Sequence, residues 1–547
     1  MIERPLVSFC LSLYFGMLFV TCLLSHSILF AALAAIFFIS NIILCKKLYI
    51  IPTIFFFLIG IISITIYYNY RIDSNETIRI NYSSPQYIIG ETGRRKIYIR
   101  GNIEGLKSGD KILAYGSYYK NINYKNGNLG YFYIDSFEKE NDFISKIYSY
   151  KENIFKKLKP EIGEDNSSLI MALVFGDKEN LDEYKNEEYK EFGISHILCV
   201  SGFHMSLTFF LLQMMFGNVM AVFGSFFYLI LVGVKPQAAR ALIMIVTACF
   251  GKYINKSYDS LSSLSLAFIT ITLISPYLIL DLGTLISFLA VLGIILFNSK
   301  INKRLVFLPA KIADMVSISL SAQVFALPMI GYVFNQVNLF FLFGNLILVP
   351  ILTIIIYLSL PLLITVNSKF LFYLNCRILQ IAFYILLGAE SITEKIIWPA
   401  ADVSGYFIIS ILLMMIFIIF SRKYTVLKKL YIPVVILFYL GRYSFVPVLI
   451  SADNVYIIKN GFNTYLISDY YINDDKDIIE AKMKYSPNII YTSIGSNRNI
   501  ILSRYKFNFL KFKDKLKLEV YYNNIKIAEF ISGENESCCF INNKIIR

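Results

Sequence analysis

The stretch Leu48–Tyr68 reads LYIIPTIFFFLIGIISITIYY and contains no charged residue. A helix needs about 20 predominantly apolar residues to cross the roughly 30 Å hydrocarbon core of a bilayer. The stretch therefore predicts a membrane-spanning helix. Apolar segments at about 6–24 and 28–45 precede it, and we expect them to be retained helices rather than a cleaved signal peptide, because one leads straight into the next.

The composition of the whole chain agrees with a membrane protein. Of 547 residues, 56% are hydrophobic and 16% are charged, and the mean hydropathy is +0.58. Soluble proteins carry roughly 25% charged residues. Because long apolar runs recur along most of the chain, we predict a polytopic α-helical membrane protein with about 11–13 transmembrane helices.

Most of the predicted helices follow residue 193, where the sequence is almost continuously apolar up to residue 450. We divide this region at about 194–216, 218–234, 237–251, 260–280, 282–298, 313–333, 337–365, 371–391, 404–421 and 430–450. The segment 371–391 carries Arg377 and Glu390, so a surface helix is the alternative there. Clusters of Lys and Arg fall in alternate loops, which predicts a multi-pass protein of the cytoplasmic membrane with a cytoplasmic N-terminus.

Three polar regions interrupt or follow the apolar segments. Residues 71–141 contain short runs of β-formers between turn residues (77–80, 96–99, 111–114 and 131–134), which favour a small external β-barrel of the OB type. Residues 142–192 predict amphipathic helices on the membrane surface. Residues 451–547 predict an external domain of α/β or mostly β structure, with a hairpin at 455–467, a helix at 475–484 and a strand at 488–492.

Basic and aromatic residues of the predicted barrel are candidates for binding nucleic acid. The formal net charge of +14 is compatible with an anionic partner, and such barrels hold single strands on basic and aromatic groups. The alternative is that these are solvated loop cations and ordinary strand aromatics. The candidates are Arg94, Arg95, Lys96, Tyr115, Tyr118 and Tyr119.

The block Gly193–His204, GISHILCVSGFH, contains two of the three histidines of the chain. On a helix, His196 and His204 would face one side. Ionisable groups at membrane depth usually line a cavity or pair with one another, so we interpret Ser195, His196, Ser201, Gly202 and His204 as a polar lining or a broken helix. A packing role for both histidines and a Ser–His hydrolase site are the alternatives.

Further polar residues in apolar segments extend the candidate lining. Arg240 follows Pro236 and enters an apolar segment that runs to Phe250, where a guanidinium is costly unless it faces water, an anion or a carboxylate. Asp281 is its nearest plausible partner in sequence, and a structural Arg–Asp pair and a phosphate contact stay open. Gln323 and Asn345 complete the set. Few carboxylates accompany these groups, which favours passage of a polyanion over a cation.

The sequence predicts no cofactor and no metal site. The eight cysteines show no metal or disulfide framework, and two histidines without further ligands fall short of a zinc site. No GxxxxGK[ST] phosphate loop is present, so we expect no ATPase activity.

These residues resemble a known family. Gly193-Ile194-Ser195-His196 with Ser201-Gly202-Phe203-His204 is similar to the signature of the ComEC competence proteins. Pro236 with Arg240-Ala241, Asp281-Leu282-Gly283 with Ser287-Phe288, Ala322-Gln323 and Asn345…Pro350 resemble further blocks, although Thr284 and Leu285 replace an expected Phe and Gln. The resemblance covers about residues 1–450.

The resemblance implies a channel that carries single-stranded DNA across the cytoplasmic membrane during natural transformation. It also implies partners, namely a competence DNA receptor and a cytoplasmic ATPase translocase. Family members often end in a metallo-β-lactamase-like nuclease domain, but residues 451–547 contain no histidine. We therefore predict a truncated or degenerate tail without nuclease activity. A membrane hydrolase and a small-solute transporter are the alternative functions.

Overall fold

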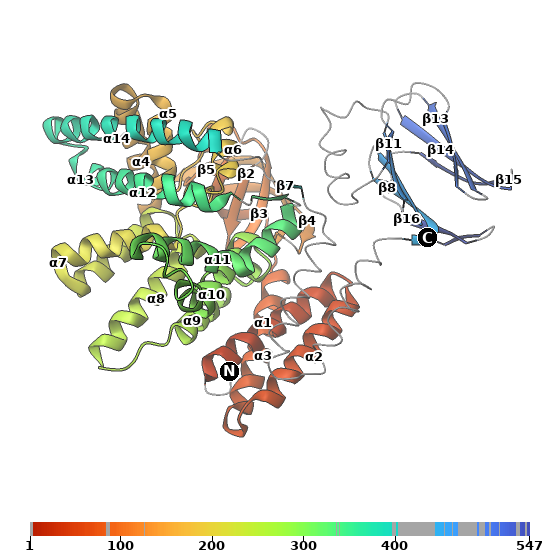
Figure 1. Cartoon of the computed structure of the whole chain (residues 1–547), viewed down its shortest axis with the longest axis horizontal. Coiled ribbons are helices and arrows are strands. Elements are labelled where there is room, and N and C mark those ends of the chain that lie inside the picture. Colours follow the sequence, from red (N-terminus) through yellow and green to blue (C-terminus); the bar gives the residue numbers. More distant parts are fainter. Residues whose placement is uncertain are drawn as a thin grey trace. The chain divides into compact units, whose positions relative to one another are not determined.

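A computed structural model describes the chain as two compact units. One comprises Met1–Ala326 and Phe340–Pro399, and the other Leu327–Leu339 and Ala400–Arg547. The residues described are 4–83, 88–124, 126–334, 336–338, 340–396, 401–402, 444–452, 455–461, 463–468, 489–491, 498–502, 505–512, 515–523, 525–531, 537–541 and 544–546. Figure 1 shows the helices and strands of each unit with their labels.

Three apolar helices open the first unit, as predicted: α1 (Pro5–Leu24), α2 (Ile28–Leu44) and, after the short 3₁₀ turn η1 (Lys47–Tyr49), α3 (Ile50–Tyr68). Glycine lets α1 and α3 approach closely. A Cβ on Gly16 would lie 2.3 Å from the carbonyl oxygen of Phe57, and a Cβ on Gly60 would lie 2.5 Å from that of Leu13. Small residues at contacts are a usual way to pack helices in membranes.

A five-stranded sheet follows, made of β1 (Asn75–Ser83), β2 (Ile88–Thr92), β3 (Arg95–Gly101), β4 (Lys111–Asn123) and β5 (Asn128–Glu140). The strand order is β1-β2-β3-β5-β4, and β4 pairs again with β1, so the sheet closes on itself. We call it the closed sheet. All four predicted strands are confirmed, and β2 is the strand that the pattern missed. Alternate residues such as Ile78, Ile80, Ile97 and Ile99 fill its core.

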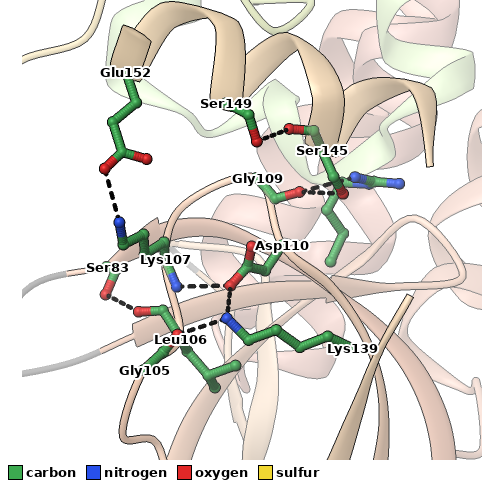
Figure 2. A network of polar contacts seen from close by, with 11 residues as sticks. Ser83, Gly105, Leu106, Lys107, Gly109, Asp110, Lys139, Ser145, Ser149 and Glu152 are labelled. Carbon is green, nitrogen blue, oxygen red and sulfur yellow. Dashed lines mark hydrogen bonds and ion pairs between the residues drawn. The ribbon is translucent and has the colours of Figure 1, made fainter. Parts of the chain in front are cut away.

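The loop Ile103–Asp110 of the closed sheet rests on helix α4 (Phe143–Ile162), and polar contacts join the two. Figure 2 shows Lys107 reaching Glu152 at 2.8 Å, and Lys139 holding Asp110 at 2.7 Å and the Gly105 carbonyl at 2.6 Å. The Gly109 carbonyl accepts from the Ser145 hydroxyl at 3.2 Å. We call this set of contacts the sheet–helix junction.

The predicted helical region 142–192 is confirmed as helical. It consists of α4, α5 (Glu164–Ile170), the π-helical turn η2 (Met171–Phe175) and α6 (Glu183–Glu191). Ile154, Leu158 and Ile162 recur at helical spacing along α4 and are buried. They join a core that also contains Phe175, Tyr189 and residues of the later apolar helices.

The apolar region after residue 193 contributes a second group of apolar helices to the first unit. They are α7 (Gly202–Leu231), α8 (Pro236–Tyr253), α9 (Ser260–Ile274), the turn η3 (Pro276–Ile279), α10 (Leu282–Asn302), α11 (Ala310–Phe334), α12 (Phe341–Ser359), α13 (Leu362–Thr365) and α14 (Lys369–Ile396). Helix α11 runs past Ala326 into the other unit. Within α7, Gly217 has a φ of 79°, which breaks the helix where the sequence predicts a boundary between two segments.

Most of the predicted apolar segments form helices where the structure describes them. In the part of the chain that the structure describes, seven helices are long and apolar enough to cross a membrane, and α2 and α9 are shorter apolar helices. The predicted segments 194–216 and 218–234 correspond to the two parts of α7 on either side of Gly217, although α7 starts only at Gly202 because residues 194–201 form turns. The predicted segment 404–421 lies outside the described residues.

The second unit contains small sheets. The hairpin predicted at 455–467 and the strand predicted at 488–492 are confirmed, whereas the helix predicted at 475–484 lies outside the described residues. The prediction of a transmembrane helix over 430–450 is wrong at its end, because Ser444–Ala452 forms a strand that pairs with a neighbour on each side. A run of apolar, β-branched residues does not distinguish a buried strand from a helix by itself.

The strands of this unit pair in three sheets. One has the order β11-β10-β9-β8-β16-β17 and another the order β12-β13-β14-β15, while β6 pairs with β7. The bounds are β6 Gln336–Val337, β7 Ala401–Asp402, β8 Ser444–Ala452, β9 Val455–Gly461, β10 Asn463–Ser468, β11 Ile489–Tyr491, β12 Arg498–Leu502, β13 Tyr505–Phe512, β14 Lys515–Tyr522, β15 Ile525–Ile531, β16 Ser537–Ile541 and β17 Lys544–Ile546.

Candidate functional site

The block Gly193–His204 forms a turn-rich segment that leads into α7. His196 lies in the turns and is exposed, and Ser195 is half-buried. Because His196 precedes the first residue of α7, the expectation that both histidines face one side of a helix is wrong. Gly193 and the polar residues after it favour turns, so α7 starts at Gly202 and not at residue 194, where the apolar pattern alone would place its start.

Ser201 and His204 together cap the N-terminus of α7. The Ser201 side chain accepts a hydrogen bond from the Phe203 N–H at 3.2 Å, and the Ser201 N–H donates to Nδ1 of His204 at 3.2 Å. This reciprocal arrangement satisfies backbone groups that a helix start leaves without partners. It also makes Nδ1 an acceptor, so the proton of a neutral His204 ring sits on Nε2. His204 is fully buried, and its Nε2 has no hydrogen-bond partner among the residues that the structure describes.

Arg240 is the buried cation of this region, with 7% of its surface exposed. Its Nε donates to the Ser287 hydroxyl on α10 at 3.1 Å, and its guanidinium carbon lies 5.8 Å from the centroid of the Phe288 ring. A Cβ on Gly202 would lie 2.7 Å from an Nη2 atom of Arg240, so glycine at that position leaves space for the guanidinium. We call Gly202, Arg240 and Ser287 the Arg240 site.

The expected ion pair between Arg240 and Asp281 is not formed. Asp281 instead caps α10, since its carboxylate accepts from the N–H and the hydroxyl of Thr284 at 2.8 and 2.7 Å. Within the described ranges, no carboxylate lies within ion-pair distance of Arg240. The guanidinium charge is therefore held by a hydroxyl, an aromatic ring and apolar groups.

Three helix N-termini meet at the Arg240 site. Gly202 is the first residue of α7 and touches Arg240 near the start of α8. At the start of α10, a Cβ on Gly283 would lie 3.0 Å from Nε2 of Gln237, the second residue of α8. Each helix N-terminus carries a partial positive charge and N–H groups that favour anions. The guanidinium and the starts of α7 and α8 therefore place positive charge at this site, while the Asp281 carboxylate at the start of α10 offsets part of it.

The remaining candidates of the apolar region lie on α11 and α12. The Asn345 amide on α12 donates to the Ser319 hydroxyl on α11 at 3.4 Å. Buried oxygens of Gln323 and Asn345 have no hydrogen-bond partner within the described part of the chain. The start of α12 also supports the 193–204 block, because a Cβ on Gly344 would lie 2.1 Å from the Phe192 carbonyl oxygen. The structure thus brings Gly202 and Arg240 together, and places Gln323 and Asn345 on other helices.

The three basic candidates of the closed sheet lie at or next to the turn between β2 and β3. Arg94 occupies the turn with a φ of 63°. The Arg95 guanidinium lies 4.1 Å from the centroid of the Tyr70 ring. The Lys96 N–H donates to the Tyr67 hydroxyl on α3 at 3.2 Å. Partial burial lowers the pKa of Lys96, and the nearby Asp281 carboxylate raises it by less. Arg95 and Lys96 therefore belong to the contact between the sheet and the end of α3, whereas Arg94 is exposed in the turn.

The three tyrosine candidates differ in direction. Tyr118 points into the sheet, where its hydroxyl donates to the Leu129 carbonyl at 2.7 Å, so it is a packing residue and not part of an exposed face. Tyr115 is half-buried. Tyr119 has 60% of its surface exposed. Residues 115 and 119 therefore fit the outer surface, whereas Tyr118 lies on the same face as the buried Ile112 and Ala114 and pairs with the buried Phe132.

The structure also shows an aromatic surface that the sequence reasoning missed. Tyr98 on β3 pairs in register with Tyr131 on β5, which pairs with Tyr119 on β4. Arg100 and Tyr133 form the next pair along the same two strands. Period-two spacing of Tyr98 with Arg100, and of Tyr131 with Tyr133, is the signal that would have found them.

Comparison with known proteins finds a family model that matches the region containing the Arg240 site. Residues 173–423 match the family model described as "Competence protein". This part of the chain, a little under half of it, is similar to the competence protein family. ComE operon protein 3 of Bacillus subtilis (strain 168) is 24% identical over 225 residues, which are 40% of this chain and 28% of that protein. The alignment thus spans under a third of this competence relative. No solved structure matches the chain.

The family match contains every residue of the Arg240 site and both helices that hold Gln323 and Asn345. The closed sheet, over residues 75–140, precedes it. Among the residues that the structure describes, no group of three or more His, Cys, Asp or Glu side chains is placed to hold a metal ion.

Proposed function

We propose that this protein is a membrane channel that carries single-stranded DNA inward across the cytoplasmic membrane during natural transformation. The family match supports a role in DNA uptake. The observation that carries the finer proposal is the buried Arg240 guanidinium, which meets the N-termini of α7, α8 and α10. A phosphate is the chemical group that such an arrangement attracts.

The charge balance of this region favours an anion over a cation. Cation pathways are lined by carboxylates, whereas the one acidic residue near the start of α10, Asp281, is engaged in capping that helix. An unpaired guanidinium in an apolar surrounding is costly. A passing phosphodiester would compensate that charge, so DNA would interact with Arg240 more strongly than with surrounding hydroxyls.

We infer that the closed sheet is an OB-like domain outside the membrane. Five strands that close on themselves correspond to the OB type of barrel, which often binds single strands. The distribution of Lys and Arg supports a cytoplasmic N-terminus and an external sheet and tail.

We propose that other proteins cut the DNA and move the strand. Residues 451–547 contain no histidine, so they lack the ligands of a two-metal nuclease. No phosphate loop for ATP is present in the sequence. A competence DNA receptor would deliver the strand, and a cytoplasmic ATPase translocase would pull it inward.

One observation favours a second function, a membrane hydrolase. The Ser201 hydroxyl lies 3.2 Å from Nδ1 of His204, which is hydrogen-bond reach for a nucleophile and a base. The same nitrogen already accepts the Ser201 N–H, and the ring is fully buried. A helix cap accounts for both contacts, so we favour the structural role.

A deletion strain tests the proposed function. Labelled duplex DNA would be supplied to the deletion strain, to the same strain with the gene restored, and to the parent. We expect nuclease-protected label inside the cells to disappear on deletion and to return on restoration, while surface-bound label persists. Normal internalisation in the deletion strain would refute the proposal.

A further inference from the structure

The outer surface of β3, β5 and β4 carries a cluster of tyrosines and one arginine. The rings of Tyr98 and Tyr131 are stacked with centroids 5.5 Å apart, and those of Tyr119 and Tyr133 meet edge to face at 5.2 Å. The Arg100 guanidinium lies 4.6 Å from the centroid of the Tyr131 ring. We call Tyr98, Arg100, Tyr119, Tyr131 and Tyr133 the tyrosine face.

Packing inside the closed sheet does not explain these side chains. The residues between them, Ile97, Ile99, Phe132 and Ile134, point inward and are buried. Tyr119 and Tyr133 expose 60% and 37% of their surfaces, and Arg100 is exposed. Large aromatic rings displayed next to a cation on a sheet surface are typical of a recognition surface.

We propose that the tyrosine face binds unpaired DNA bases by stacking. Every base has an aromatic face, so exposed rings hold a strand without reading its sequence. Arg100 adds a charge that suits the phosphates, and it also keeps the Tyr131 ring in place. A duplex offers few base faces, because they are already stacked on one another. The surface therefore suits a single strand better than a duplex.

The position of the tyrosine face agrees with delivery toward the helices. On β3, Lys96 lies on the same side as Tyr98 and Arg100, and its N–H donates to the Tyr67 hydroxyl of α3. The Tyr67 hydroxyl in turn donates to the Gly127 carbonyl, one residue before β5, at 2.7 Å. The row of Tyr98 and Tyr131 thus starts about two residues, or roughly 7 Å, from the contact with the membrane helices.

Two acidic residues lie near this surface: Glu91 on β2, which pairs in register with Lys96, and Asp135 on β5. Asp135 follows Tyr133 by two positions on β5 and is exposed. It lies beyond the Arg100–Tyr133 pair, at the end of the surface that is farther from α3. A strand that stacks on Tyr98, Tyr131 and Tyr119 does not need to cross it.

The choice of DNA as the ligand rests on the proposed function, and binding by the purified full-length protein tests it. The protein in detergent would be titrated into a labelled 15-nucleotide dT strand, and fluorescence anisotropy would report Kd. We expect Tyr119→Ala and Tyr131→Ala each to weaken binding by about tenfold, the loss of one stacking contact. Tyr119→Phe keeps the ring and should bind like the unaltered protein.

Controls separate stacking from other causes. Tyr184 on α6 exposes 73% of its surface, so Tyr184→Ala is the matched control and should bind like the unaltered protein. Tyr119→Ala should unfold at the unaltered temperature, because its ring is mostly exposed. A duplex of the same length and a strand without bases should both bind more weakly than dT.

Three outcomes would overturn the inference: unchanged binding by Tyr119→Ala, equal binding of the strand without bases, or tyrosine-dependent binding of soluble cell-wall glycan in place of dT. The deletion experiment above is independent of these outcomes. Weakened binding together with normal uptake in the deletion strain would leave this inference standing and refute the import function. Lost uptake together with unchanged binding would do the reverse.

Discussion

The Arg240 site and the tyrosine face offer opposite kinds of surface to the same proposed ligand. Arg240 is 7% exposed and is surrounded by helix ends and apolar groups, whereas Tyr119 is 60% exposed on a sheet. A charge acts strongly where water is excluded, but an aromatic ring stacks on a base wherever both are accessible. Under the proposed function, bases would be held outside the helices and phosphates among them.

The two regions are connected by contacts of the closed sheet with α3 and α4. The sheet–helix junction holds the loop Ile103–Asp110 against α4, and the Arg79 side chain reaches Asp142 at the start of that helix. Because the three sites lie on different elements, changes at the Arg240 site, at the junction and at the tyrosine face should have separable effects. The predictions below follow the expected size of the effect.

The largest effect on stability is expected from Gly344→Ala. The added Cβ would meet the Phe192 carbonyl at 2.1 Å, so α12 or the segment before α7 must move. Overpacking of this kind costs about 1–3 kcal/mol. Gly388→Ala on α14 is the control, since nothing lies within 4 Å of its Cβ position. Thermal unfolding in detergent should show a lower Tm for Gly344→Ala and an equal or higher Tm for Gly388→Ala.

An intermediate effect is expected from Asp142→Asn at the sheet–helix junction. Partial burial raises the pKa of Asp142, but hydrogen bonds from Arg79 and from the Ser145 N–H and hydroxyl lower it by more, so the pKa lies below its ordinary value. The charged carboxylate thus stabilises the fold above the pKa of the unfolded state, and this stabilisation disappears as the pH falls through the lower folded-state pKa.

We expect Asp142→Asn to lose about 1 kcal/mol at neutral pH, as for a weakened helix cap with an ion pair removed. Its Tm should also fall less steeply on acidification below pH 4 than that of the unaltered protein. An identical acid dependence in both proteins would mean that Asp142 does not contribute in this way.

Much of the fold was predictable because its determinants are local. Apolar length predicts α1, α3, α10 and α14, and alternation of apolar residues predicts β1, β3, β4 and β5. The end of the segment 430–450 was not predictable from hydropathy, because strand β8 is as apolar as a helix and is determined by its partners β9 and β16.

The candidate site was predictable in part for the same reason. Gly202 and Arg240 were selected from the sequence, and the structure brings them together. The pairing of Arg240 with Ser287 and the capping role of Asp281 depend on how α8 and α10 pack, which no local pattern specifies. The tyrosine face was missed because it requires the register of three strands. Tyr118 was included because candidates were selected by residue type, although it shares the inward face of Ile112 and Ala114.

A smaller effect is expected from Ser201→Ala. If Ser201 caps α7, its loss should cost about 1 kcal/mol and leave DNA uptake within a few-fold of the unaltered level. Thermal unfolding and the uptake assay measure the two quantities. Uptake abolished at an unchanged Tm would instead support the hydrolase alternative.

The smallest effect at neutral pH is expected from Lys151→Met. Lys151 on α4 is 3% exposed, with its ammonium 4.4 Å from the Tyr148 ring centroid. Burial lowers the pKa of Lys151 to about 8, the nearby Asp177 raises it, and Lys235 lowers it. Since the unfolded chain binds this proton up to about pH 10.4, stability should rise with pH between these values. Lys151→Met should remove that rise and leave Tm at pH 7 equal or higher.

DNA uptake by Arg240→Met tests the role of the buried guanidinium most directly, with Arg377→Met as the matched control. Arg377 is an exposed arginine on α14 that contacts Tyr373 and Gln380. We predict that Arg240→Met lowers nuclease-protected uptake by about 100-fold, as for the loss of a charge-assisted contact of about 3 kcal/mol, at an unchanged Tm and membrane level. Arg377→Met should take up DNA normally. Normal uptake by Arg240→Met, or an equal loss in both variants, would contradict a phosphate-binding role for Arg240.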